Sequence, residues 1–149
     1  MDDQPLDAQR GSLTVSTDHS RLDVDAALDL LRTTFWGHTL DRETLTRAIA
    51  NSLCFGLYDG TRLVGFGRVV TDRATYAYWT DVVTAPEYRG RGLGHWLCQC
   101  MLDHPDLQGL RRIGLLTRDA VPLYQRLGFT TELGALTYME LRAPTEPTK

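Results

Sequence analysis

Residues 89–94 read Arg89-Gly90-Arg91-Gly92-Leu93-Gly94, the most informative segment of this chain. It lies between a predicted strand at 75–84 and a predicted helix at 92–104. The first amides of a helix lack partners within the helix, and the helix dipole is positive there. Glycines at this junction can therefore expose those amides to a phosphate group, although a plain flexible turn is an alternative interpretation.

Two common glycine-rich phosphate sites fit this stretch poorly. A nucleoside-triphosphate loop requires Gly-Lys-Ser/Thr, and the single lysine of the chain is Lys149 at its end, which excludes that site. A dinucleotide fingerprint requires a third glycine, where this sequence has His95 or Leu97 depending on the frame. The preceding strand also belongs to a predicted antiparallel meander, so the dinucleotide interpretation is weak.

Periodicity outward from this stretch predicts the other elements. Asp23 and Asp41 are expected to begin two amphipathic helices, and Asp59-Gly60 is expected to form a tight hairpin turn. A helical crossover makes the strands on either side of helix 92–104 parallel. The predicted order is β-α-α-β-β-β-α-β-α-β-β, with strands at 13–15, 53–58, 62–71, 75–84, 112–117, 129–133 and 136–142. Residues 1–11 and 143–149 are expected to be frayed ends.

Composition bounds the class of protein. A chain of 149 residues with 42% hydrophobic and 23% charged residues fits one soluble α/β domain over residues 1–149, with an ordered core at about 13–142. The net charge of −3 provides no footprint for nucleic acid, and no apolar run is long enough to span a membrane. The three cysteines lack zinc-site spacing, so we expect no metal, no disulfide and a cytoplasmic location.

The pattern Arg-x-x-Gly-x-Gly at 89–94 resembles the central motif of the GNAT superfamily of N-acetyltransferases. Residues 81–88 are similar to the pantetheine strand and proline-containing turn of that family. Residues 123–129, Leu-Tyr-Gln-Arg-Leu-Gly-Phe, are similar to its second signature, Leu-Tyr-x-x-x-Gly-Phe. Two motifs in the right order are more specific than either alone, and the resemblance covers roughly residues 13–142.

This resemblance implies the GNAT fold: a mixed, mostly antiparallel sheet with a splay between two central parallel strands. It implies acetyl-coenzyme A (acetyl-CoA) as co-substrate, with pantetheine on the strand amides and pyrophosphate on the glycine turn. Thr117 occupies a position where many relatives have an asparagine that touches the cofactor. The implied cofactor-binding residues are Val82, Val83, Thr84, Arg89, Gly90, Arg91, Gly92, Leu93, Gly94 and Thr117.

The resemblance also assigns the chemistry. Tyr124 matches the family tyrosine that protonates or hydrogen-bonds the coenzyme A sulfur, and a phenol keeps its proton at neutral pH. Asp81 is the predicted catalytic carboxylate, with Glu87, His38 or a water chain as alternatives for the base. The acceptor is expected to lie near the loop between the first two helices and the later strands, with Trp36, His38 and Tyr78 as its predicted binding residues.

The expected reaction is acetyl transfer to a primary amine by direct attack in a ternary complex. An acyl-CoA-binding sensor without turnover is the alternative, since no base can be assigned with certainty from the sequence. The acceptor can be a small molecule or a peptide amine, and the sequence does not name it. The segment 136–141 is expected to form an edge strand that a second copy covers, which predicts a homodimer.

Overall fold

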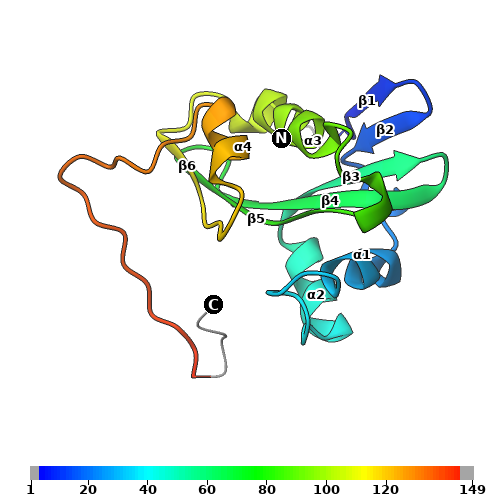
Figure 1. Ribbon diagram of the computed structural model, residues 1–149, viewed down its shortest axis with the longest axis horizontal. Helices are drawn as coiled ribbons and strands as arrows, with labels where there is room; N and C mark the ends of the chain where they lie inside the picture. The colour runs from blue at the N-terminus through cyan, green and yellow to red at the C-terminus, as the bar shows by residue number, and fades with distance from the viewer. Residues whose placement is uncertain (1–3, 145–149) are drawn as a thin grey trace. The chain divides into compact units, whose positions relative to one another are not determined.

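A six-stranded mixed sheet with helices on both faces forms the main body of the protein, as seen in the computed structural model (Figure 1). The structure describes residues 4–144. These residues form two compact units, one ending at Leu116 and one beginning at Thr117, which are described separately. The whole sheet belongs to the first unit. The prediction of one domain over residues 1–149 stays a prediction.

The strands follow one another across the sheet in chain order. They are β1 (Asp7–Arg10), β2 (Leu13–Ser16), β3 (Leu53–Asp59), β4 (Arg62–Thr71), β5 (Tyr76–Thr84) and β6 (Arg112–Leu115). All neighbouring strands are antiparallel except β5 and β6, which are parallel as the helical crossover between them predicts. Gly60 has a positive φ of 60° at the predicted turn between β3 and β4. The predicted class, a mixed and mostly antiparallel α/β sheet with one parallel strand pair, is confirmed.

Local sequence signals set the helix ends. Asp23 accepts a hydrogen bond from the Asp25 amide at the start of α1, and Asp41 accepts one from the Thr44 amide at the start of α2, as predicted. The first-unit helices are α1 (Val24–Leu31), α2 (Arg42–Ala50) and α3 (Leu93–Asp103), with short 3₁₀ turns η1 (His19–Arg21), η2 (Pro86–Tyr88) and η3 (Pro105–Leu107). No helix in residues 4–144 has the length and apolar character to cross a bilayer.

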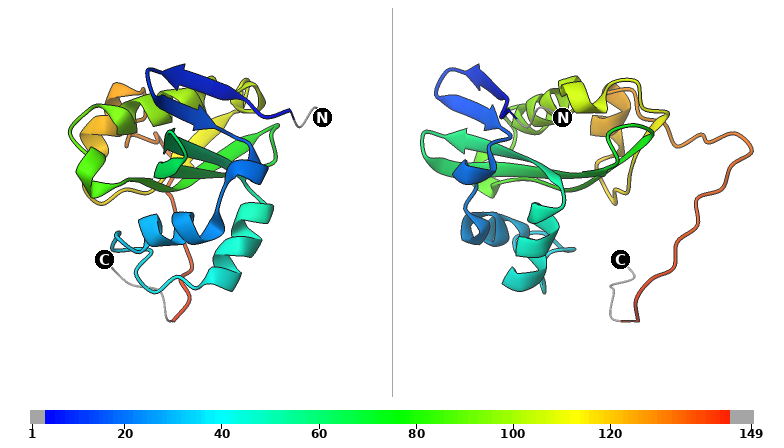
Figure 2. Two further views of the ribbon diagram at one scale, coloured as in Figure 1. Left: turned by 90° about the vertical axis from the view of Figure 1, so that its right-hand side faces the viewer. Right: turned by 180° about the vertical axis from the view of Figure 1, so that it is seen from behind.

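The helices of the first unit cover the sheet in two layers. Helices α1 and α2 lie on one face, and α3 lies on the other (Figures 1 and 2). The apolar residues between these layers are fully buried, and we expect their burial to supply most of the favourable folding free energy of this unit. They include Leu31, Leu45, Leu57, Val64, Phe66, Val69, Leu97 and Met101.

Both chain ends differ from the sequence prediction. Residues 7–10 form β1, which pairs with β2 in a hairpin turned by Gly11 and Ser12, so the expectation of a frayed end is wrong there. The signal was hidden because three of its four residues are polar, as an edge strand tolerates. The rest of the predicted frayed ends includes residues 1–3 and 145–149, which lie outside the described residues.

The second unit contains α4 (Val121–Arg126) and no strand within residues 117–144. The predicted strands at 129–133 and 136–142 are therefore wrong, as is the edge strand at 136–141. A turn does form between them, with the Leu136 amide donating to the Leu133 carbonyl at 3.2 Å and Gly134 at a φ of 64°. Alternating apolar residues indicate a strand only when a neighbouring strand pairs with them, and this segment has no such ladder here.

The loop between α1 and α2 folds tightly around Gly37. A Cβ at this position would clash with the Leu31 carbonyl oxygen and lie 2.9 Å from Thr34 Oγ1. We therefore expect Gly37→Ala to lower the free energy of unfolding by about 1 to 3 kcal/mol, the usual cost of overpacking. The exposed neighbour Thr39 offers a control, for which Thr39→Ala should change stability by less than about 0.5 kcal/mol. Urea unfolding measures both, and equal stabilities would contradict the close packing of this loop.

Candidate functional site

Strand β5 changes its pairing halfway along its length. Its parallel ladder with β6 ends at the pair Trp79 and Leu115, while its antiparallel pairing with β4 continues to Thr84. Asp81 and Val82 together lie opposite the single residue Gly67, which makes a β-bulge, and Asp81 has a positive φ of 58°. Within residues 4–116, the segment from Thr80 to Thr84 thus has a strand partner on one side only.

The glycine turn leads directly into α3. Gly90 and Gly92 have positive φ angles of 80° and 73°, and a Cβ at either position would meet no atom within 4 Å. Gly92 is the N-cap of α3, and among the described residues no side chain caps this end of the helix. Residues 89–92 are exposed, whereas Leu93 is buried and anchors the helix. The amino end of α3 therefore offers unpaired amides and a positive dipole to an anion.

The turn is braced from the hairpin between β3 and β4. Tyr88 Oη donates to Asp59 Oδ2 at 2.6 Å, and Arg62 forms an ion pair with Glu87. The hydrogen bond to Tyr88 lowers the pKa of the Asp59 carboxyl. The pKa of Glu87 is also lowered, by a hydrogen bond from its own amide and by Arg62, so Glu87 is a weak proton acceptor. Arg62 and Tyr88 could not be identified from the sequence, because their partners lie 25 and 29 residues away along the chain.

The two arginines of the motif contact the same turn. Arg89 Nε donates to the Thr84 carbonyl at 3.2 Å, which engages one backbone acceptor of the predicted pantetheine strand. The Arg91 guanidinium lies 4.8 Å from the centre of the Tyr88 ring and donates to the Glu87 carbonyl. Both side chains are exposed, so their positive charges are accessible at the entrance to α3.

Trp36 and Asp81, predicted from distant parts of the sequence, are in contact. Trp36 Nε1 donates to Asp81 Oδ1 at 3.1 Å, and Arg68 Nε donates to Asp81 Oδ2 at 2.8 Å. Arg68 was not identified from the sequence, since a charged residue on a strand is usually a solvated one. His38 lies exposed in the same loop as Trp36, and Tyr78 is half-buried on β5. The structure thus joins Trp36, one of the three predicted acceptor-binding residues, to the predicted catalytic carboxylate Asp81 by a hydrogen bond.

The second unit holds the remaining predicted residues. Thr117 Oγ1 accepts a hydrogen bond from the Ala120 amide at 3.0 Å and so closes the turn before α4. Tyr124 lies on α4, is 9% exposed, and packs edge to face against Phe129 with ring centres 5.7 Å apart. The Phe129 amide also donates to the Tyr124 carbonyl at 3.0 Å. The second signature therefore forms one locally packed element.

The environments of the cysteines disfavour a thiolate nucleophile for a covalent acyl intermediate. Burial raises the pKa of both Cys54 and Cys98 to about 12, so their thiols stay protonated at neutral pH. Burial also raises the pKa of Cys100. Within the described residues, His, Cys, Asp and Glu side chains form no group of three that could hold a metal ion.

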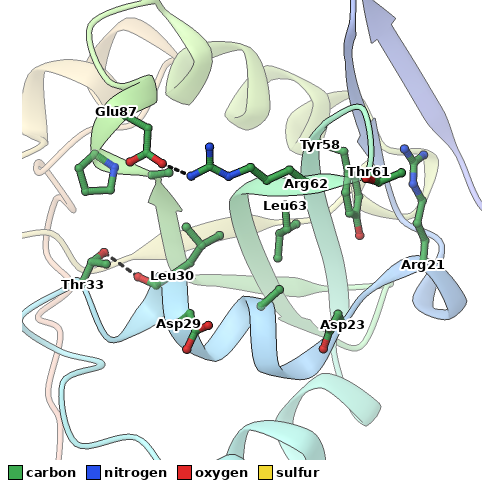
Figure 3. Close-up of a pocket in the computed structure, with 13 residues that line it drawn as sticks. Arg21, Asp23, Asp29, Leu30, Thr33, Tyr58, Thr61, Arg62, Leu63 and Glu87 are labelled. Atoms are coloured by element: carbon green, nitrogen blue, oxygen red, sulfur yellow. Dashed lines mark hydrogen bonds and ion pairs between the residues drawn. The ribbon is translucent and has the colours of Figure 1, made fainter.

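An open cavity of about 450 Å³ lies against α1, next to the same hairpin. Figure 3 shows Leu30 of α1 pointing toward the hairpin that carries Leu63, with the Arg62–Glu87 pair nearby. Of the residues predicted from the sequence to take part in the site, Glu87, an alternative for the base, lines the cavity. The cavity and the glycine turn share the ion pair of Arg62 and Glu87, since both residues line the cavity.

Comparison with known proteins gives a consistent result. The family described as "Acetyltransferase (GNAT) family" matches residues 24–129. The Gibberella zeae protein named "Putative acetyltransferase FG08082" is 35% identical over 160 residues, which cover 92% of this chain and 86% of that protein. These similarities favour a transferase over the alternative of an acyl-CoA-binding module without turnover.

Solved structures agree with the fold. A structure from Xanthomonas campestris pv. campestris, described as a putative GNAT-family acetyltransferase, is 45% identical with a TM-score of 0.83, covering 89% of this chain and 94% of that chain. A GNAT-family acetyltransferase from Elizabethkingia anophelis with acetyl-CoA bound is 13% identical with a TM-score of 0.64, covering 81% and 78% of the two chains. The latter likeness concerns the fold alone, and it shows that this fold binds acetyl-CoA.

Proposed function

This chain belongs to the GNAT acetyltransferase family, and from that premise we propose that it transfers the acetyl group of acetyl-CoA to a primary amine by direct attack in a ternary complex. One observation carries the proposal. The uncapped, glycine-lined amino end of α3 follows directly after the part of β5 that has left the parallel ladder. An anionic group and an extended amide chain can bind to these two neighbouring backbone segments.

In this proposal the backbone binds most of acetyl-CoA. The amides of residues 89–94 hold the pyrophosphate, with Arg89 and Arg91 adding positive charge. The backbone of Val82, Val83 and Thr84 pairs with the pantetheine, and a β5 amide near Val83 polarises the thioester carbonyl. Support comes from the exposure of the turn and from the absence of a second strand partner for residues 80–84 within residues 4–116. Thr117 is the remaining proposed cofactor contact.

The proposed chemistry balances without a covalent enzyme intermediate. The neutral amine nitrogen attacks the thioester carbonyl carbon, a C–N bond forms, and the C–S bond breaks. Tyr124 donates its proton to the departing thiolate, and the proton lost from the amine nitrogen restores the phenol through water. The products are an N-acetyl amide and the free thiol of coenzyme A. The high thiol pKa values of Cys54 and Cys98 are consistent with direct transfer.

The acceptor side is proposed to include Trp36, His38 and Tyr78. Trp36 is 39% exposed and stands beside Asp81, so an aromatic surface is available next to a carboxylate. The Asp81 carboxylate stays a candidate for the base that removes the proton from the amine. A cytoplasmic location and a homodimer stay sequence predictions, and sedimentation of the full chain tests the homodimer.

A panel of amines tests the proposed function. The full chain is mixed with acetyl-CoA and, in turn, with polyamines, aminoglycosides, amino sugars, arylalkylamines and lysine peptides, while release of coenzyme A thiol is followed. We expect one class to give thiol release well above the rate without amine, and mass spectrometry should find the acetylated product. If acetyl-CoA raises the melting temperature but no class increases thiol release, the proposed transfer to an amine is wrong.

A further inference from the structure

Four side chains from separate parts of the first unit form one connected chain of hydrogen bonds. Ser52, just after α2, accepts from Arg68 Nη1 on β4 at 3.1 Å. Arg68 donates from Nε to Asp81 Oδ2 on β5 at 2.8 Å, and Asp81 Oδ1 accepts from Trp36 Nε1 in the α1–α2 loop at 3.1 Å. The chain of contacts links β5 to the α1–α2 loop, which carries the predicted acceptor-binding residues Trp36 and His38.

The Arg68–Asp81 pair is mostly buried, at 17% and 10% side-chain exposure. A buried ion pair is weak evidence for stability, because desolvation of both charges offsets their attraction. Asp81 also has a positive φ, an uncommon backbone state for a non-glycine residue that clusters at functional sites. An ion pair that contributes little to stability, at an unusual backbone conformation, therefore indicates that the orientation of the Asp81 carboxylate has a functional role.

Both oxygens of the carboxylate are already engaged. One accepts from a guanidinium and the other from an indole N–H. If Asp81 took a proton from a substrate ammonium group, it would lose the charge that attracts Arg68. The same two contacts instead fix where the indole of Trp36 lies, since its ring has only two rotatable bonds and its N–H has a fixed acceptor.

We propose that Arg68 and Asp81 form a positioning pair that holds Trp36 as one wall of the acceptor site, so that Arg68 determines acceptor binding through Trp36. This inference rests on the proposed function and deepens it. It predicts acceptor amines with a flat or apolar part next to the nitrogen, because the wall is the face of an indole. The pair then contributes to acceptor affinity, and proton removal falls to water.

The first test needs no turnover. The chain has three tryptophans, so a ¹⁵N-labelled sample should give three indole N–H signals, and Trp36→Phe identifies the one from Trp36. We expect Arg68→Met and Asp81→Ala to shift that signal and speed its exchange with solvent, and Arg68→Lys to restore most of its position. If the Trp36 signal is unmoved in Arg68→Met, the proposed link is wrong. If a single variant does not fold, the double variant Arg68→Met, Asp81→Leu takes its place, because it removes both charges and leaves neither one buried without a partner.

The second test uses kinetics with the panel amine that gives the fastest thiol release. Under the positioning role, Arg68→Met and Trp36→Phe raise the KM of the amine by about 5-fold, with kcat and the KM of acetyl-CoA little changed. Asp81→Ala should show the same deficit at every pH. A deficit in Asp81→Ala that lies in kcat and disappears as the pH approaches the pKa of the amine would identify Asp81 as the base and overturn the positioning role.

The two tests separate failure of this inference from failure of the proposed function. If no amine is acetylated, the proposed function fails while the indole signals still report whether Arg68 and Asp81 hold Trp36. If an amine is acetylated and Trp36 moves in the variants without any change in the KM of that amine, Trp36 has no part in acceptor binding. The inference then fails while the proposed function stands.

Discussion

Tyr124→Phe is expected to lower kcat by about 10-fold to 100-fold. The upper figure is the lower end of the rate enhancement that general acid catalysis commonly contributes. The substitution removes one oxygen and leaves a ring that can still pack edge to face against Phe129. The departing thiolate then takes its proton from water, which is not positioned for the transfer. Thiol release at saturating acetyl-CoA and amine measures the effect.

Tyr138→Phe is the matched control for this variant. It makes the same chemical change in the same unit, where Tyr138 is 54% exposed and donates to Glu140 at 3.1 Å. We expect its kcat to stay within about 2-fold of the wild type, because exposed positions rarely affect catalysis. Both variants should bind acetyl-CoA with wild-type affinity. Full activity in Tyr124→Phe would remove this phenol from the proposed chemistry.

Gly92→Asp is expected to weaken acetyl-CoA binding by at least about 30-fold. The new carboxylate stands at the amino end of α3, where the pyrophosphate is proposed to bind. Two like-charge contacts at about 4 Å cost about 2 kcal/mol even in water, which corresponds to about 30-fold in Kd. Isothermal titration with acetyl-CoA measures the loss, which should diminish in high salt because screening weakens the repulsion.

Gly109→Asp separates this effect from backbone strain. Gly109 has a φ of 74°, close to the 73° of Gly92, and a Cβ at either position meets no atom within 4 Å. Both variants thus carry the same added charge and a similar cost, about 1 to 2 kcal/mol, for a non-glycine residue in the left-handed region. We expect the affinity to change only at Gly92. Equal affinities in the two variants would show that the turn does not bind the pyrophosphate.

The parts of the fold with local signals could be predicted from the sequence. Helix starts at Asp23 and Asp41 follow from capping, and the hairpin at Gly60 follows from the positive φ that its turn requires. The glycine turn before α3 was also predictable, since a helix start after two glycines is a local event. These features depend on residues within a few positions of each other, which is the range over which sequence patterns act.

Features that depend on distant partners could not be predicted. The polar strand β1 exists because β2 offers an edge, while the alternating segment after α4 forms no strand because no ladder pairs with it. Arg68 looks like a solvated strand residue until Asp81 is seen 2.8 Å away. Even Asp59, predicted as a turn residue, gains its contact to Tyr88 only when the hairpin and η2 fold together.

The β3–β4 hairpin supports the glycine turn, so the proposed binding of acetyl-CoA there should depend on ionic strength at two points. Arg62 and Glu87 are both more than half exposed, so their attraction weakens as dissolved ions shorten the Debye length to about 8 Å at physiological ionic strength and about 3 Å at 1 M. In the proposed complex the same ions also compete with Arg91 for the diphosphate. The hairpin tip, about 30 residues upstream, would then help to hold the nucleotide end of acetyl-CoA without touching it.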